Sequence, residues 1–315
     1  MSIKISFKKN INEKLIKNYV LFCDDTFKIK GLHKTQISKY SKFINETINN
    51  NKQKDNNFLM FNLNSKQKIV LVKIKNNKSS IENEKIGAQF YNFLKTNLIL
   101  SSLFIDENIK ETNLKNSNFF DEFLHGVNLK SYEFTKYKTT DKIRLFEINI
   151  LTKSLLKLDN KKRFNSLIEG LNLTKDLVSE PGNVLHPDEY AKRIGQLRKL
   201  GLKITIYDKK KLKKLGMNAL LGVGQGSIRG SYLVTIEWNG ATSKVKPCAF
   251  VGKGVCFDTG GISLKPAKFM EDMTYDMAGS AVVVGLMKSL AIRKAKINAI
   301  GVVGLVENMP GGNAQ

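Results

Sequence analysis

Cysteine and histidine are scarce in this sequence of 315 residues, which contains three of each. The cysteines are odd in number and form no CxxC pair, which argues against a disulfide framework and a thiolate zinc site and is typical of a reducing compartment. The histidines are scattered and no HExxH motif occurs, so a histidine-rich zinc site is excluded within this chain.

Long apolar runs and a secretory leader are also missing. The longest apolar candidate, around residues 281–286, falls short of the roughly 18 residues that span a bilayer and lies beside Lys288. The first residues, MSIKISFKK, contain neither an apolar segment nor a small-residue cleavage site. We therefore expect a cytoplasmic protein with no membrane partner.

Arginine is rare although the formal net charge is +24, because only six of the 52 basic residues are arginine. Arginine is the usual reader of guanine edges, whereas lysine acts mainly as a point charge on phosphate. The positive charge is also spread over both halves of the chain, which argues against a dedicated nucleic-acid face. Weak, non-specific binding of DNA or RNA remains an alternative.

The chain is long enough for two domains. Alternating apolar runs at 68–74 and 142–150, with a helical pattern at 84–98 between them, predict an N-terminal α/β domain over residues 1–158. An amphipathic helix over 164–178 followed by the breaker SEPGN places a linking helix and turn at 159–183. Beyond it, strands alternate with helices over 184–315, which predicts a second α/β domain with a mixed sheet covered on both faces.

The chemistry-bearing residues are concentrated in one block, VGKGVCFDTGGISLKP at 251–266 and MEDMTYDMAG at 270–279. A short apolar strand at 249–251 is expected to deliver Lys253, and a glycine-rich loop to carry Asp258 and Lys265. Asp276 is expected to open the next helix, over 276–292. Oxygen ligands without histidine or cysteine suit Mn²⁺, Mg²⁺ or Zn²⁺ in an oxygen-rich site.

Each of these side chains also has a purely structural explanation. Lys253 is compatible with a salt bridge at a strand end, and Lys265 is compatible with a solvated charge on a loop. Asp258 can form an Asx turn, and Asp276 can cap a helix. Cys256 lies near Asp258, but no histidine base is close in sequence, so a cysteine protease is disfavoured.

The same block resembles the signature of the cytosolic leucine aminopeptidases, the family-17 metallopeptidases that include bacterial aminopeptidase A. The resemblance begins with GLNLTKDLVSEPGN and VLHP at 170–187 and continues through KLGMNALLGVGQGS at 214–227 and the block at 251–279 to ENMPGG at 307–312. It covers about residues 165–315. The N-terminal domain agrees only in position and α/β character, which in this family is macro-domain-like.

The resemblance implies a role for five residues. Lys253, Asp258 and Asp276 correspond to ligands of two divalent metal ions, Mn²⁺ or Zn²⁺ with Mg²⁺ as a third candidate; Lys253 must be neutral to ligate, and Asp258 bridges both ions. Lys265 corresponds to the catalytic lysine that polarises the scissile carbonyl. Met273 corresponds to a wall of the apolar pocket for the first substrate side chain. The implied activity is two-metal hydrolysis that releases leucine and other apolar residues from peptides with a free N-terminus, by a homohexamer.

The sequence departs from this family at its end. The segment that carries the next two metal carboxylates and an arginine, with a pattern like NTDAEGR, is not found within residues 1–315. We therefore expect the catalytic domain to be incomplete at residue 315 and the chain to be a C-terminally truncated member whose own activity is uncertain. The alternatives are a non-catalytic, basic DNA- or RNA-binding protein and a degenerate remnant of the family.

Overall fold

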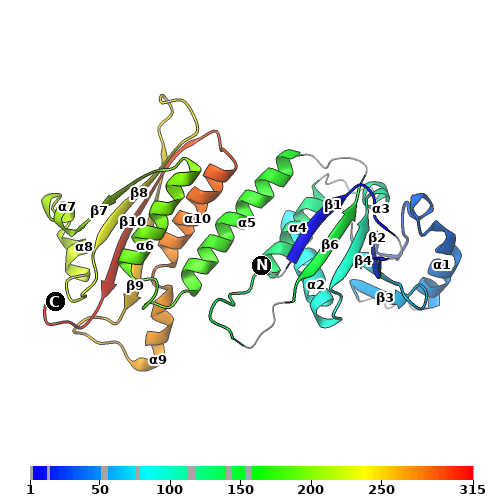
Figure 1. Ribbon diagram of the computed structural model, residues 1–315, viewed down its shortest axis with the longest axis horizontal. Helices are drawn as coiled ribbons and strands as arrows, with labels where there is room; N and C mark the ends of the chain where they lie inside the picture. The colour runs from blue at the N-terminus through cyan, green and yellow to red at the C-terminus, as the bar shows by residue number, and fades with distance from the viewer. Residues whose placement is uncertain are drawn as a thin grey trace. The chain divides into compact units, whose positions relative to one another are not determined.

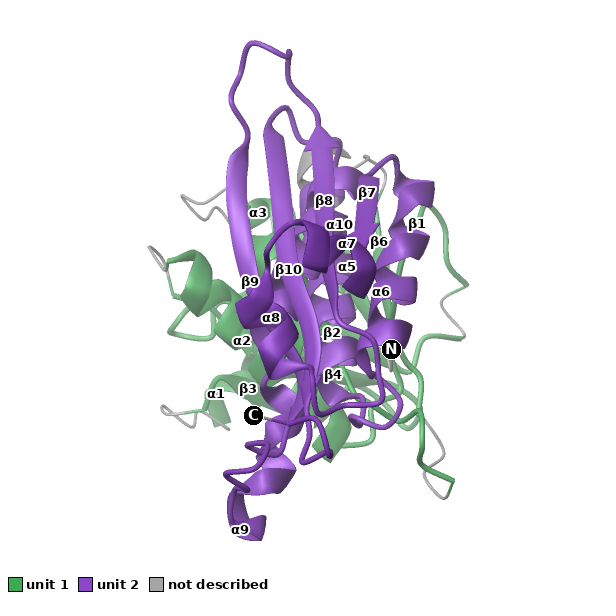
Figure 2. Ribbon diagram, turned by 90° about the vertical axis from the view of Figure 1, so that its left-hand side faces the viewer, with its two compact units in different colours: residues 1–161 green, residues 162–315 purple. Residues whose placement is uncertain are grey.

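The computed structural model describes residues 3–12, 15–50, 56–75, 79–112, 118–139, 144–152 and 158–314. The chain divides into two compact units, unit 1 over residues 1–161 and unit 2 over residues 162–315 (Figure 2). Both units combine helices with a β-sheet, so the expectation of a two-domain α/β protein is confirmed.

Unit 1 contains a six-stranded sheet in the order β1-β6-β5-β2-β4-β3 (Figure 1). The pairs β1–β6, β6–β5, β5–β2 and β2–β4 are parallel, whereas β3 pairs antiparallel with β4 at the edge. Its strands are β1 Ile3–Lys8, β2 Asn18–Cys23, β3 Phe58–Asn62, β4 Lys68–Lys73, β5 Ser101–Ile105 and β6 Phe146–Leu151. Its helices are α1 Ser41–Asn50, α2 Ser80–Thr96, α3 Asp106–Glu111 and α4 Phe119–Lys130, with short 3₁₀ turns at Leu32–Lys34 and Ser38–Tyr40.

Both faces of the unit 1 sheet are buried, as the alternation along β2 shows. Val20 and Phe22 pack into an aromatic-rich core beneath α2 and α4. Tyr19, Leu21 and Cys23 point to the opposite core, which α1 closes. A parallel strand covered on both faces reads as a continuous apolar run, which is why its sequence shows little alternation.

The expected helix at 84–98 is confirmed as α2, which begins earlier because Ser79 and Glu82 form a reciprocal cap. The Ser79 hydroxyl accepts from the Glu82 amide and the Glu82 carboxylate accepts from the Ser79 amide. The strand expected over 142–150 is β6, which begins at Phe146; residues 142–143 lie outside the described part of the chain.

Unit 2 contains a four-stranded sheet in the order β7-β8-β10-β9. Only β9 and β10 are parallel, and β8 pairs antiparallel with both β7 and β10, so the sheet is mixed as expected. Its strands are β7 Lys203–Tyr207, β8 Tyr232–Asn239, β9 Cys248–Asp258 and β10 Asn298–Asn308. Its helices are α5 Leu158–Ser179, α6 Pro187–Gly195, α7 Lys209–Lys214, α8 Asn218–Val223, α9 Ala267–Met270 and α10 Ala278–Ile292, with 3₁₀ turns at Gln196–Leu200 and Glu271–Tyr275.

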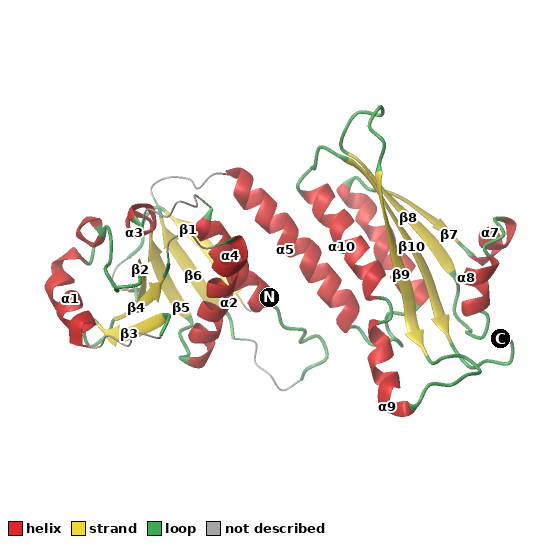
Figure 3. Ribbon diagram, turned by 180° about the vertical axis from the view of Figure 1, so that it is seen from behind, coloured by secondary structure: helices red, strands yellow, loops and turns green. Residues whose placement is uncertain are grey.

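One face of this sheet is fully covered and the other only partly. Helices α5, α6 and α10 pack on the covered face, where the core includes Tyr190 and Met287 (Figure 3). On the opposite face Leu220 of α8 lies over Gly304 of β10. Val251 of β9 is 80% exposed, so the expected cover on both faces holds only for part of the sheet within the described residues.

By length and composition alone, the stretch 267–292 could cross a membrane. It was not apparent from the sequence, because it contains no long uninterrupted apolar run. More than half of its most apolar window is buried inside the protein, at 56%. The stretch is also divided into α9, a 3₁₀ turn and α10. This burial and division are the properties of a core helix.

Strand β9 is longer than the sequence pattern predicted. The expected strand ended at residue 251 and left Asp258 on a loop, whereas β9 continues through Asp258. The reason is its parallel partner β10, whose backbone supplies hydrogen-bond partners along the whole of Ala299–Asn308. The prediction of a loop at this point was therefore wrong, and both Lys253 and Asp258 lie on a strand.

Asp188, in the first turn of α6, links that helix to β8. Its Oδ1 accepts hydrogen bonds from the Tyr232 hydroxyl at 2.7 Å and from the Gly230 amide at 3.1 Å. Partial burial acts to raise the pKa of Asp188, but these hydrogen bonds and the neighbouring His186 outweigh it, so the pKa lies below its ordinary value. The ionised carboxylate is thus the form that the fold stabilises.

We expect Asp188→Asn to lower the free energy of unfolding by about 1 kcal/mol at pH 7. The value is kept small because 38% of the side chain is exposed. Since the folded-state pKa is depressed, this stabilisation is complete above the unfolded-state pKa of about 4 and is lost as the pH falls through the folded-state value. Urea unfolding at pH 7, 5 and 3.5 measures the difference. Asp272→Asn, at an exposed carboxylate, is the control, and an equal loss at all three pH values contradicts the prediction.

Candidate active site

The candidate site lies along β9, where a bulge determines which side chains share a face. The pairing of β9 with β10 changes register between Val306 and Asn308, with one more residue on β9 than on β10. Such a bulge reverses the alternation of side chains. Lys253 and Asp258 are an odd number of residues apart and would otherwise point to opposite faces, but the bulge brings them to the same face.

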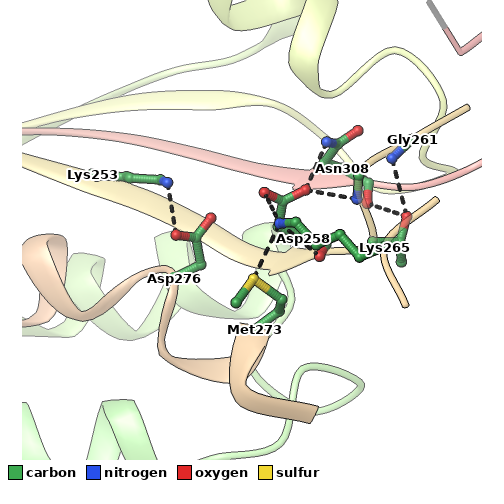
Figure 4. Close-up of polar contacts among 9 residues, drawn as sticks. Lys253, Asp258, Gly261, Lys265, Met273, Asp276 and Asn308 are labelled. Atoms are coloured by element: carbon green, nitrogen blue, oxygen red, sulfur yellow. Dashed lines mark hydrogen bonds and ion pairs between the residues drawn. The ribbon is translucent and has the colours of Figure 1, made fainter. Parts of the chain in front are cut away.

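The first pair at this site is Lys253 with Asp276. The Lys253 Nζ lies 2.6 Å from the Asp276 Oδ1 (Figure 4). The two elements approach closely because of glycine: a Cβ on Gly252 would lie 2.7 Å from the backbone oxygen of Gly279, in the first turn of α10. Asp276 was expected to open the next helix, but α10 begins at Ala278. Asp276 directly precedes the N-cap residue Met277.

The second pair is Asp258 with Lys265, brought together by a tight loop. The Lys265 Nζ lies 2.6 Å from the Asp258 Oδ2. Gly260 and Gly261 have φ angles of +90° and +69°, a left-handed conformation that favours glycine. The Thr259 amide and hydroxyl both donate to the Asn308 carbonyl, at 3.0 and 2.9 Å, which anchors the loop on the end of β10.

Asp258 is held by more than one donor. Its Oδ1 accepts from the Gly260 amide at 2.9 Å and from the Asn308 Nδ2 at 2.7 Å (Figure 4). The first of these contacts is the Asx turn that the sequence also allowed. Partial burial acts to raise the pKa of Asp258, and the bonds from Lys265, Gly260 and Asn308 outweigh it, so the pKa lies below its ordinary value. The carboxylate is therefore ionised at neutral pH.

Asn308 was missed by the sequence reasoning. It lies in the ENMPGG segment that carried the resemblance, but no role followed from a single amide at a strand end. Only the pairing of Asn308 with Asp258 across β10 and β9 shows that it orients the carboxylate. The signal available in the sequence was its position as the last residue of an apolar strand.

Met273 also lies at this site. Its sulfur is 3.1 Å from the Lys265 Nζ, so the thioether and the amine are in contact (Figure 4). Met273 belongs to the 3₁₀ turn Glu271–Tyr275, which packs beside β9. The five residues predicted from the sequence therefore form two adjacent groups, Lys253 with Asp276, and Asp258 with Lys265 and Met273.

One carboxylate oxygen at this site is not accounted for by the two ion pairs and is suited to contact a divalent cation. The Asp276 Oδ2 is buried and has no hydrogen-bond partner among the described residues, while its Oδ1 contacts Lys253. A buried carboxylate oxygen without a donor is costly. Within the described part of the chain no group of three or more His, Cys, Asp or Glu side chains is placed to hold a metal, so a metal here needs ligands of another kind, and the Lys253 amine is the nearest to Asp276.

Two neighbouring features do not add chemistry. Burial raises the pKa of the Cys256 thiol, which keeps it protonated and makes it a poor nucleophile. The glycine-rich GVGQG run at 222–226 is closely packed, because a Cβ on Gly226 would lie 2.2 Å from the backbone oxygen of Met309.

Comparison with known proteins gives one consistent result. Residues 172–315 match the model of the cytosol aminopeptidase family, catalytic domain. A probable cytosol aminopeptidase of Afipia carboxidovorans is 52% identical over 198 residues, which is 60% of this chain and 39% of the relative. A probable cytosol aminopeptidase of Phytoplasma australiense is 53% identical over 199 residues, which is 61% of this chain and 40% of the relative. The chain thus spans about two fifths of the length of these curated relatives.

Solved structures share the fold. The cytosol aminopeptidase from Coxiella burnetii matches with a TM-score of 0.74 at 18% identity, over 99% of this chain and 62% of that one. The bottromycin maturation enzyme BotP in complex with Mn matches with a TM-score of 0.72 at 21% identity, over 95% of this chain and 61% of that one. The family model and the curated relatives agree that residues 172–315 are similar to the catalytic domain of the cytosol aminopeptidase family, and the solved structures share the fold of the chain.

Proposed function

We propose that this chain contributes Lys253, Asp258, Asp276, Lys265 and Met273 to a metal-dependent aminopeptidase site. The observation that carries the proposal is the buried Asp276 Oδ2, which has no hydrogen-bond partner among the described residues and lies on the carboxylate that contacts the Lys253 amine. Asp258 and Asp276 supply the carboxylate oxygens that hard divalent cations accept, and Lys253, once neutral, would add a nitrogen ligand. The name of the BotP structure, which contains Mn, gives further support for Mn²⁺ as one candidate ion.

In the proposed site, Lys253, Asp258 and Asp276 hold divalent ions, Mn²⁺ or Zn²⁺ with Mg²⁺ as a third candidate. Bound ions would supply Lewis-acid polarisation of the peptide carbonyl and a water of lowered pKa. Lys253 becomes a ligand only after its amine loses a proton, so loading the site separates the Lys253–Asp276 ion pair. Asp258, already ionised and oriented by Asn308, requires no such change.

Lys265 acts on the substrate in this proposal. Its Nζ donates to the oxygen of the scissile carbonyl, where negative charge develops during hydrolysis. The Lys265 side chain is 31% exposed and its amine is held by Asp258, so a peptide can reach it from the surface. Met273, in contact with the same amine, supplies an apolar wall for the first side chain, which favours leucine and other apolar N-termini.

The substrates are then peptides with a free N-terminus, and the compartment is the cytoplasm, as the names of the curated relatives suggest. Three ligands cannot saturate two ions, so we infer that this chain by itself holds one ion well and the second weakly. The proposal therefore separates metal binding, which the chain can be tested for directly, from catalysis.

We expect the chain to bind Mn²⁺ with release of a proton from Lys253. Lys253→Met and Asp276→Asn should each weaken binding by at least about tenfold, and Lys253→Met should also abolish the proton release. Calorimetric titration in two buffers of different ionisation enthalpy measures both quantities. Asp272→Asn, in the same segment but exposed, is the matched control. Unchanged affinity in both site variants contradicts the proposal.

A further inference from the structure

A cavity lies in unit 1, apart from the residues of the candidate active site. It has a volume of about 380 Å³ and opens where β1, β6 and β5 end, between Lys9, Ile105 and Leu151. Volumes of roughly 300 to 1,000 Å³ are usual for small-molecule sites. In open α/β sheets such sites form outside the carboxyl ends of the parallel strands, which is the position of this cavity.

One of the residues that line the cavity, Gln36, has a side-chain donor without a partner among the described residues. This donor, the Gln36 Nε2, is buried. Gln36 is held in place by its neighbours Thr35 and Ile37, which are both buried. A buried amide group is normally paired, so this donor calls for an acceptor oxygen supplied from within the cavity.

The charges on the lining are of both signs. Lys34 is already paired with Glu111, which does not line the cavity. Lys9 and Glu107 form no ion pair within the described part of the chain. Among the described residues, the cavity therefore presents one cation and one anion without an ion-pair partner, together with the amide of Gln36. The remaining lining includes the apolar side chains of Ile11, Ile105 and Leu151.

We propose that this cavity binds a zwitterionic α-amino acid or dipeptide with an apolar side chain. The carboxylate accepts from Gln36 Nε2 and Lys9, the ammonium donates to Glu107, and the apolar side chain lies against Ile105 and Leu151. A purely anionic ligand would be repelled by the Glu107 carboxylate. A purely cationic ligand would provide no acceptor for Lys9 and the Gln36 amide. The site is separate from the residues of the proposed catalysis and does not depend on it.

The test is methyl NMR on the full chain, with labelled isoleucine methyl groups and EDTA present. We expect L-leucine and leucylglycine to shift the methyl signals of Ile11 and Ile105 saturably at millimolar concentration. The ligand that binds more tightly in these two titrations decides between an amino acid and a dipeptide. N-acetylleucine, which lacks the ammonium, and leucinamide, which lacks the carboxylate, should each bind about tenfold more weakly. Ile262, in the loop after Asp258, reports on binding at the candidate active site.

Variants assign the contacts. Lys9→Ala and Glu107→Gln should each weaken leucine binding by about tenfold, whereas Lys4→Ala, which removes the same charge from an exposed position on β1, should have no effect. The proposal is overturned if neither Ile11 nor Ile105 shifts, which would mean that the cavity holds water only. It is also overturned if Ile262 alone shifts, or if Lys9→Ala and Glu107→Gln bind like the unaltered chain.

Discussion

Replacing Asp258 with alanine should lower the release of N-terminal leucine by at least about a hundredfold, measured in a longer polypeptide that contains this chain. Asp258 is the residue on which the site converges, because its carboxylate accepts from Lys265, Asn308 and the Gly260 amide. Its removal takes away a proposed metal ligand and also releases the Lys265 amine from its position. The measurement is kcat/KM for leucyl-p-nitroanilide at saturating Mn²⁺.

Two further variants separate the chemical role of Asp258 from its structural one. Asp258→Asn retains a side-chain oxygen for the Gly260 amide but removes the charge, so it should preserve the loop and still lose nearly all activity. Asp272→Ala removes an exposed carboxylate from the neighbouring 3₁₀ turn and should leave kcat/KM within about twofold. A loss of less than about tenfold in Asp258→Ala would falsify the assignment of Asp258 as a ligand.

Gly87→Ala should destabilise the protein by about 3 kcal/mol, a large effect for the addition of one methyl group. Helices α2 and α4 cross in unit 1 at two glycines. A Cβ on Gly87 would lie 2.0 Å from the Phe123 carbonyl oxygen, and one on Gly126 would lie 1.9 Å from that of Glu84. Both clashes are with backbone, which cannot move aside as a flexible side chain would.

Urea unfolding followed by circular dichroism measures this loss, while the single tryptophan, Trp238 in β8, reports separately on unit 2. Gly312→Ala is the matched control, because no atom lies within 4 Å of its added Cβ. A change of less than about 1 kcal/mol for Gly87→Ala would show that the two helices can separate at little cost.

Much of the local structure of this protein is determined by the sequence by itself. The helices at 84–98 and 164–178 could be predicted because their apolar spacing is local. The candidate residues Lys253, Asp258, Lys265, Met273 and Asp276 came from a motif with fixed spacing. Local periodicity and motif spacing are properties of the chain itself, so they need no knowledge of what packs against it.

Only the tertiary structure decided which of these residues meet. The end of β9 and its bulge depend on the pairing with β10, and without the bulge Lys253 and Asp258 would face opposite ways. The role of Asn308 depends on the same pairing, and the cavity beside Gln36 depends on three strand ends that are distant in sequence. Register and strand-end geometry are set by long-range backbone hydrogen bonds, which leave no periodic trace in the sequence.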